Sequence, residues 1–372
     1  MAEYLTNTTD LTKVATAIRE KGGTSDPLVY PDGFVVAIQA IQTGTELQII
    51  VSVTSGATVT ATKGSLSVSG TSVNGTCTLV VPEAGTWTVK ATLNGQTSGT
   101  KSITFMDSYD VTLAFVSPTL NDNDWAKIRE VSDNGEGANY WSIGDRKAVT
   151  LNGRVGALTL SNFTTYAFII GFNHNASLEG ANRIHFQLGK TALSGGTDVC
   201  FCDSYYGNMG GGFRMNENET NSGGWKSSQM RTAICGTSLS SYSGTIIAVI
   251  PAALRAVLKS VTKYTDNTGN STAASAVTAT TDYFFLLSTY EVFGTSDGTN
   301  SNEASKQAQY SYYSAGNSKV KYNHSATSTA VHWWLRSPWT YRSTNFILAS
   351  TEGTIIVTSA NYSYGFAPGF CV

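Results

Sequence analysis

The segment that most constrains the fold of this chain is its last forty or so residues, from His332 to Val372. It begins with His332-Trp333-Trp334-Leu335-Arg336-Ser337-Pro338 and ends with Gly365-Phe366-Ala367-Pro368-Gly369-Phe370-Cys371-Val372. The large apolar side chains, prolines and glycines of these two segments predict tight packing and fixed turns. Most residues between them are Tyr, Ser, Thr and Asn. The sequence therefore predicts a polar and aromatic surface held between two buried framework segments.

The residues between the framework segments have the composition of an antibody paratope. Tyr and Trp offer rigid contact area, while Ser, Thr and Asn offer adaptable hydrogen bonds. The predicted ligand-binding residues are Trp339, Thr340, Tyr341, Arg342, Ser343, Thr344, Asn345, Ile347, Ser350, Thr351, Glu352, Thr354, Val357, Thr358, Ser359, Asn361, Tyr362, Ser363 and Tyr364. Ordinary β-rich proteins use the same residue types in exposed strands and loops, so composition alone leaves a plain solvated surface as an equal alternative.

Residues 1–45 are predicted to form a helical N-terminal segment. The apolar positions at helical spacing are Leu11, Val14 and Ile18 in one helix and Phe34, Ile38 and Ile41 in the next. Neither helix is long enough to be stable without burying its stripe. The two helices therefore pack on each other or on a neighbouring domain, or they form a docking or trimerising element.

Residues 46–114 alternate apolar and polar side chains, which is the period of a half-buried strand. The alternation is clearest at residues 57–61 and 87–91. Asn74-Gly75 and Asn94-Gly95 are dipeptides that favour two-residue hairpin turns. Short strands at this spacing predict a small β-sandwich, and its threonine-rich faces suit a spacer better than a binding site.

Residues 115–372 mix helical and strand signals, which predicts an α+β domain. The acidic run at residues 121–124 precedes Trp125 and favours a helix cap. A calcium loop is the alternative, but the glycine and distal glutamate of an EF-hand are missing. A helix is expected to begin at Pro251 and to extend to Val261. Alternation at residues 183–188 predicts a strand with His185 exposed.

Charge and hydropathy exclude several classes of protein. The 372 residues carry a formal net charge of −2 and no basic block, which argues against nucleic acid as a partner. The longest apolar run, residues 246–258, contains a proline and an arginine and is too short to span a membrane. The N-terminus lacks the basic and apolar regions of a signal peptide.

No cofactor, metal ion or catalytic residue is predicted. The five cysteines are Cys77, Cys200, Cys202, Cys235 and Cys371. They include no C-x-x-C pair, so they indicate neither a disulfide framework nor a zinc site, and buried reduced thiols are expected. Gly210-Gly211-Gly212 lacks the Lys and Ser/Thr of a phosphate-binding loop and is predicted to be a flexible loop.

The two framework segments, with four further stretches, resemble a family of phage and prophage proteins. The four stretches are residues 125–128, 138–145, 225–231 and 261–269. The C-terminal domain of that family is C-type-lectin-like, related to formylglycine-generating enzymes, and some members are variable proteins of diversity-generating retroelements. The resemblance implies a C-type-lectin-like domain at residues 115–372, with a variable region at 332–372. Residues 1–45 and 46–114 resemble a short module and an immunoglobulin-like module of phage tail proteins, the latter without its disulfide.

In such variable proteins, adenines of a template are randomised during copying. Asn codons of the template then become codons for Tyr, Ser, Thr, Asp, Ile, Val or Arg, which fits most of the predicted ligand-binding residues. Trp339 and Glu352 do not fit, because a codon ending in a pyrimidine encodes neither residue. These two positions require a different template codon or are fixed.

The resemblance implies a non-enzymatic receptor-binding protein of a phage tail, made in the host cytoplasm without a signal peptide and carried in the virion. Its expected partners are a host cell-surface protein or glycan and, through residues 1–45, other tail proteins, with a homotrimer as the candidate assembly. A fixed-specificity carbohydrate-binding lectin and a structural tail protein are the alternatives. An enzyme is least favoured, because thiol chemistry of the formylglycine-generating type needs a defined cysteine pair and only Cys371 lies near the shared motif.

Overall fold

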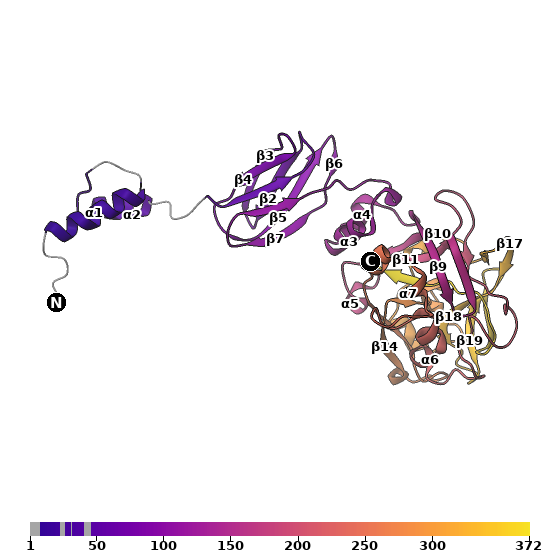
Figure 1. Ribbon diagram of the computed structural model, residues 1–372. Helices are drawn as coiled ribbons and strands as arrows, with labels where there is room; N and C mark the ends of the chain where they lie inside the picture. The colour runs from indigo at the N-terminus through magenta and orange to yellow at the C-terminus, as the bar shows by residue number, and fades with distance from the viewer. Residues whose placement is uncertain (1–7, 23–26, 31, 41–45) are drawn as a thin grey trace. The chain divides into compact units, whose positions relative to one another are not determined.

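The computed structural model describes residues 8–22, 27–30, 32–40 and 46–372. The chain is a mixed α+β protein in which strands outnumber long helices (Figure 1). It divides into two compact units, Met1–Ala91 with Ser102–Leu113, and Thr92–Lys101 with Ala114–Val372. The larger unit therefore includes eleven residues that we predicted to lie within the sandwich, namely Thr92–Lys101 and Ala114.

Two helices, α1 (Thr8–Gly22) and α2 (Asp32–Ala40), pack on each other. Their shared core consists of Ala15, Ile18, Phe34 and Ala37. The predicted apolar stripes are partly wrong, because Val14 and Ile38 are exposed. Each helix buries only the side that faces the other, and Ile41 lies outside the described residues.

The following segment forms two sheets with buried apolar residues on both. One sheet has the order β4 (Thr76–Val80), β1 (Gln48–Ser52), β8 (Tyr109–Thr112). The other has the order β3 (Leu66–Thr71), β2 (Thr58–Lys63), β5 (Gly85–Leu93), β6 (Gln96–Thr97), with β7 (Lys101–Phe105) also paired to β5. Asn74, Gly75, Asn94 and Gly95 all have positive φ, as the predicted hairpin turns require.

The larger unit is built on a five-stranded antiparallel sheet. Its order is β15 (Phe284–Phe285), β21 (Gly369–Cys371), β11 (Ile184–Lys190), β10 (Leu158–Phe172), β9 (Arg146–Val155). The C-terminal strand β21 is thus an interior strand of the sheet. Every residue from Gly365 to Val372 is buried, so the packing role predicted for this framework segment is confirmed.

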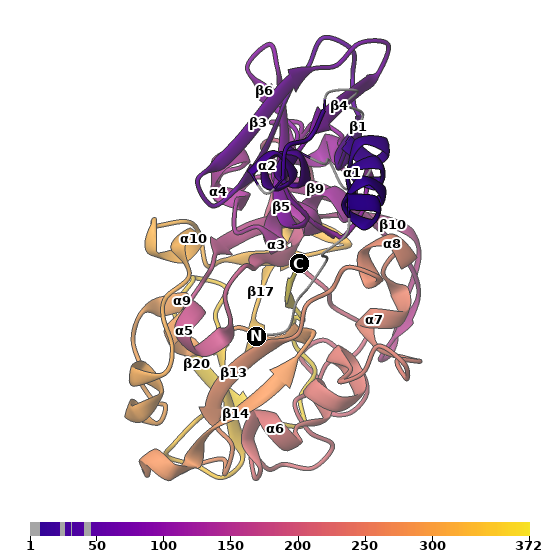
Figure 2. The ribbon, with the colours of Figure 1, turned by 90° about the vertical axis from the view of Figure 1, so that its left-hand side faces the viewer.

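Smaller sheets and short helices complete this unit (Figure 2). The sheets are β12 (Val199–Cys200), β16 (Lys321–Asn323), β17 (Ala326–Val331); β13 (Val261–Asp266), β14 (Val277–Asp282); and β18 (Trp333–Pro338), β19 (Asn345–Ala349), β20 (Ile355–Ser359). The α-helices are α3 (Trp125–Asp133), α4 (Gly137–Tyr140), α5 (Ala176–Glu179), α6 (Gly224–Ser227), α7 (Ile246–Val249), α8 (Ala252–Arg255), α9 (Thr289–Phe293) and α10 (Ser311–Ser314).

The sequence predicted the start of α3 correctly, but it was wrong about the length of the helix after Pro251 and about the exposure of His185. The Asp124 carboxylate accepts a hydrogen bond from the Lys127 backbone N–H at 2.6 Å, which is the predicted cap. The helix expected from Pro251 to Val261 is only α8, and beyond it the Lys259 N–H bonds the Cys371 carbonyl at 2.9 Å. His185 is fully buried rather than exposed, since both faces of β11 are covered.

Candidate binding surface

The region between the two framework segments folds around the sheet β18-β19-β20. All of β18 and most of β19 are buried. Strand β20 is half-buried along its length and pairs only with β19. The exposed part of this region is therefore β20 and the turns at its ends, rather than a broad sheet face.

Most of the predicted ligand-binding residues reach the surface. Those exposed are Tyr341, Arg342, Ser343, Glu352 and Thr354. Those half-buried are Trp339, Thr340, Thr344, Asn345, Thr351, Val357, Thr358, Ser359, Asn361, Tyr362 and Tyr364. Tyr341 is the most open of the aromatic side chains here, at 75% exposed.

Three of the predicted ligand-binding residues are buried and do not belong to the surface. Ile347 lies in the hydrophobic core. The Ser350 hydroxyl accepts hydrogen bonds from the N–H groups of Glu352 and Thr354 at 3.2 and 3.0 Å and so shapes the turn before β20. The Ser363 hydroxyl donates to Asp203 at 3.0 Å. These three side chains therefore stabilise the backbone under the surface rather than contact a ligand.

A buried amide holds the turn between β18 and β19. Asn221 Nδ2 lies 3.3, 2.8 and 2.9 Å from the carbonyl oxygens of Trp339, Arg342 and Asn345. At the top of this turn, the rings of Trp339 and Tyr341 pack edge to face, with centroids 5.7 Å apart. Asn221 therefore fixes the backbone that carries two of the predicted aromatic contacts.

Tyr364 is the centre of an aromatic cluster at the other end of β20. Its ring lies 5.4 Å from Tyr206, 5.8 Å from His332, 5.7 Å from Trp334 and 6.3 Å from Tyr362. The Tyr206 hydroxyl accepts a hydrogen bond from the His332 N–H at 2.7 Å. Burial raises the pKa of Tyr206 and lowers the pKa of His332. Both groups are thus neutral near pH 7, and Tyr364 is a scaffold residue as much as a contact residue.

Sequence reasoning missed the loop from Asp203 to Asn216. Its backbone N–H groups at Gly207 and Gly210 bond the carbonyls of Ser363 and Asn361 at 2.8 and 3.1 Å. The loop expected to be flexible is therefore tied to the predicted surface. Its exposed side chains include Tyr205 and Met209. The Tyr205-Tyr206 pair is the feature of this loop that could have drawn attention to it, because tyrosines also mark residues 339–364. We call residues 339–345, 351–362, Tyr364 and this loop the binding surface.

Unpaired polar atoms gather in the same place. Nine buried side-chain nitrogen or oxygen atoms lack a hydrogen-bond partner among the described residues. Five of these nine belong to Asp203, Asn221, Thr340, Ser359 and Asn361. Buried polar groups are normally paired with protein or water, so these five side chains are polar groups that the protein itself leaves unpaired.

Beneath β18 lies a cluster of buried charges. The Arg336 guanidinium forms a bidentate pair with Glu291, and the Lys263 ammonium lies 2.9 Å from Glu291 and 2.6 Å from Glu179. Burial opposes ionisation of Glu291, but the charges of Arg336 and Lys263 outweigh it and lower the pKa of Glu291. Two cations thus face two carboxylates in the interior, and the cluster anchors the framework segment.

The same cluster contains the donor atoms of a potential metal site. Ligand atoms of His174, Glu179 and Glu291 lie within 4.8 Å of one another, and all three residues are buried. Burial, reinforced by the charge of Lys263, lowers the pKa of His174 to about 3, so the ring is neutral. The Lys263 ammonium already bonds both carboxylates. The chain thus places its own cation where a metal ion would otherwise sit.

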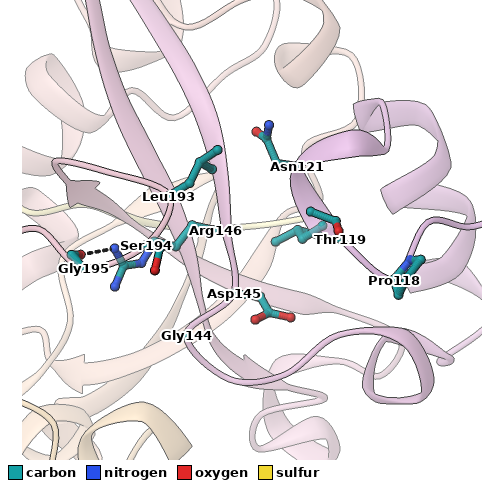
Figure 3. A pocket seen from close by; sticks show the side chains of 10 residues that line it. Pro118, Thr119, Asn121, Gly144, Asp145, Arg146, Leu193, Ser194 and Gly195 are labelled. Atoms are coloured by element: carbon teal, nitrogen blue, oxygen red, sulfur yellow. Dashed lines mark hydrogen bonds between the residues drawn. The ribbon is translucent and has the colours of Figure 1, made fainter.

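A pocket of about 380 Å³ lies elsewhere in the larger unit (Figure 3). Its residues come from the segment before α3, the start of β9 and the loop after β11. The polar groups lining it are already used within the protein. Arg146 donates hydrogen bonds to the carbonyls of Ala192, at 2.7 Å, and Gly195. The Asp145 carboxylate accepts one from the Ser142 N–H at 2.8 Å. These two charged side chains of the pocket are therefore already paired within the protein.

The fold and the surface define an α+β protein that presents an aromatic and polar strand edge on a largely buried framework. Residues 202–372 match the model of a family described as a domain of unknown function (DUF6273). This match contains the whole binding surface. No curated protein and no solved structure matches the chain. Within the described residues, no helix has the length and apolar character needed to cross a membrane.

Proposed function

We propose that this protein is a non-enzymatic receptor-binding protein of a phage tail, and that its binding surface recognises a host cell-surface protein or glycan. One observation carries the proposal. Tyr341, Arg342, Glu352 and Tyr362 reach the surface in β20 or in the turns of its sheet, while β18 and most of β19 beside it are buried. Aromatic and arginine side chains on a rigid base are the usual anchors of protein interfaces. In this proposal the larger unit has a C-type-lectin-like fold and residues 46–114 form an immunoglobulin-like spacer.

The helical segment serves attachment in this proposal. Val14, Val35 and Ile38 remain exposed after α1 and α2 have packed on each other. An exposed apolar set of this kind suits docking onto other tail proteins, or a homotrimer that would add avidity. Particles assembled with a protein that lacks residues 8–40 would then lack the receptor-binding protein on immunoblots.

The first test is binding of fluorescent protein to a panel of bacterial strains, measured by flow cytometry. The double variant Tyr341→Ser, Tyr362→Ser should bind at least about tenfold less than the wild type, because aromatic anchors contribute most of an interface's energy. Its melting temperature should stay close to that of the wild type. Tyr109→Ser, an exposed tyrosine of β8, is the matched control. Unchanged cell binding by the double variant would contradict the proposal.

Diversification is tested by sequencing the gene in a population, together with its flanking DNA. Substitutions should fall at exposed positions of residues 339–345 and 351–364, and a nearby template should carry adenines at those codons. Ile347 and the framework segments should stay constant, because changes there would disturb the core. A uniform gene without a template would favour a fixed-specificity lectin or a structural tail protein, which glycan arrays would separate.

A further inference from the structure

Strand β20 has one free backbone edge. Its register with β19 pairs Leu348 with Ile356 and Phe346 with Thr358. Beyond these, the Ser350 N–H bonds the Thr354 carbonyl at 2.8 Å, and the Ala360 N–H bonds the Thr344 carbonyl at 2.9 Å. Bonded pairs alternate along an antiparallel ladder, so the even-numbered residues of β20 bond to β19.

The backbone groups of Ile355 and Val357 therefore point away from β19. Within the described part of the chain, neither residue has a hydrogen-bond partner on that side. Natural proteins usually protect such an edge with a charged side chain, a proline or a bulge. Strand β20 reads Ile-Ile-Val-Thr-Ser, contains none of these devices, and is half-exposed along its length. The edge is open for another strand.

Opposite charges flank the two ends of this edge. Arg342 lies in the turn before β19, whose first residue Asn345 pairs with Ser359. Glu352 lies in the turn that leads into Ile355. Both side chains are exposed. Lys319 also approaches the Glu352 end, but its ammonium is directed over the ring of Phe293, 5.7 Å from the centroid. Along the strand direction, the exposed charge of Arg342 therefore lies toward the Ser359 end of the sheet, and that of Glu352 lies toward the Ile355 end.

We propose that the target recognised by the binding surface is a protein whose extended segment adds a strand to β20. Its backbone would bond Ile355 and Val357, with an acidic group near Arg342 and a basic group near Glu352. This inference rests on the function proposed above and names its target as a peptide strand rather than a glycan. Backbone pairing gives affinity that does not depend on the target sequence, whereas flanking side chains give specificity. Tyr341 and Tyr362 can then vary without loss of the pairing itself.

The decisive variant is Val357→Pro. Proline removes the outward N–H and adds bulk to the free edge, while the ladder to β19 does not use that N–H. Val357→Thr is the matched control, because it keeps the N–H and the β-branched shape. Ile355→Pro removes the other outward N–H and replaces Val357→Pro if that variant does not fold.

The probe is a displayed library of random linear twelve-residue peptides, selected on the wild-type protein with Val357→Pro as the counter-selection. We expect enriched peptides with an acidic and a basic residue at opposite ends. They should bind the wild type and Val357→Thr about tenfold or more tighter than Val357→Pro, in line with the loss of backbone hydrogen bonds. N-methylation along such a peptide should abolish binding at every second residue. Equal recovery of peptides from the wild type and Val357→Pro would overturn the proposal.

Two further readouts separate the outcomes. Concentration-dependent dimers of the wild type in sedimentation velocity, absent from Val357→Pro, would show that a second copy of this chain occupies the edge, which overturns the proposal. Undiminished cell binding by Val357→Pro would also overturn it while leaving the receptor-binding function intact. That function fails separately, if the Tyr341→Ser, Tyr362→Ser protein binds cells as the wild type does.

Discussion

Glu303 is a fully buried acid in the larger unit, and its surroundings hold it by hydrogen bonds rather than by a direct ion pair. Its carboxylate accepts from the Asp266 N–H at 2.8 Å and from Ser337 and Gln307 at 3.3 Å. Burial raises the pKa of Glu303 to about 7, despite the opposing effects of the Asp266 hydrogen bond and the Arg336 charge. The folded protein therefore retains a proton that the unfolded chain releases near pH 4.5.

This difference predicts the sign of a pH effect on stability. Between about pH 4.5 and pH 7 the folded state binds more protons than the unfolded state, so the free energy of unfolding falls as the pH rises. The contribution is about 3 kcal/mol in total. Glu303→Gln should remove most of it, which urea denaturation at pH 5 and pH 8 would measure. Glu352→Gln, at an exposed site, should leave the wild-type pH dependence unchanged. An equal pH dependence of Glu303→Gln and wild type would refute the assignment.

At the scale of single residues, the sequence predicts chemical character better than exposure. Tyr341, Arg342 and Glu352 lie at the surface as expected, because turn residues between strands are rarely covered. Ile347 and His185 were misplaced because strands inside this unit are covered on both faces. Alternation in sequence cannot reveal that second cover, which comes from segments distant along the chain.

The turn between β18 and β19 is the element on which the binding surface most depends. Asn221 satisfies three of its carbonyl oxygens. Asn221→Ala should lower the free energy of unfolding by about 2 kcal/mol. The Arg342 carbonyl loses the one donor that the described residues give it, and the carbonyls of Trp339 and Asn345 each keep only a backbone N–H. It should also weaken cell binding, since the Trp339 and Tyr341 rings lose their fixed base. Asn218→Ala, at an exposed position of the same segment, should change neither quantity. Full cell binding by Asn221→Ala would show that the turn keeps its shape without the amide.

Elements with strong local signals were predictable, and elements fixed by distant partners were not. The hairpin turns at Asn74-Gly75 and Asn94-Gly95 and the Asp124 cap follow from neighbouring residues alone. The loop from Asp203 to Asn216 joins the binding surface through bonds to residues about 150 positions later, such as Ser363. A glycine run gives no sign of such a partner. The same limit applies to the end of the helix expected after Pro251.

At the scale of the whole molecule, the five cysteines can serve as probes of the unfolding of the two compact units. All five are unpaired and buried, as their spacing predicts. Cys77 lies on β4 in the first unit, whereas the other four belong to the larger unit. Burial raises the pKa of Cys77 and of Cys235, and it raises the pKa of Cys371 to about 12. The thiols of Cys77, Cys235 and Cys371 should therefore react very slowly with a thiol reagent in the native protein at pH 8, since only the thiolate attacks.

Pulsed thiol labelling along a urea gradient should separate the unfolding of the two units. Each unit has its own buried apolar residues, and compact units of one chain commonly unfold in separate steps. Cys77 should become labelled at a different urea concentration from Cys200, Cys202, Cys235 and Cys371, which should react together. Mass spectrometry of the peptides measures the labelling of each cysteine. Cys77→Ser is the control, because in this variant the unfolding of the unit that contains β4 exposes no thiol. Labelling of all five thiols at one urea concentration would mean that the two units unfold as one, and that changes in the binding surface are felt by the whole protein.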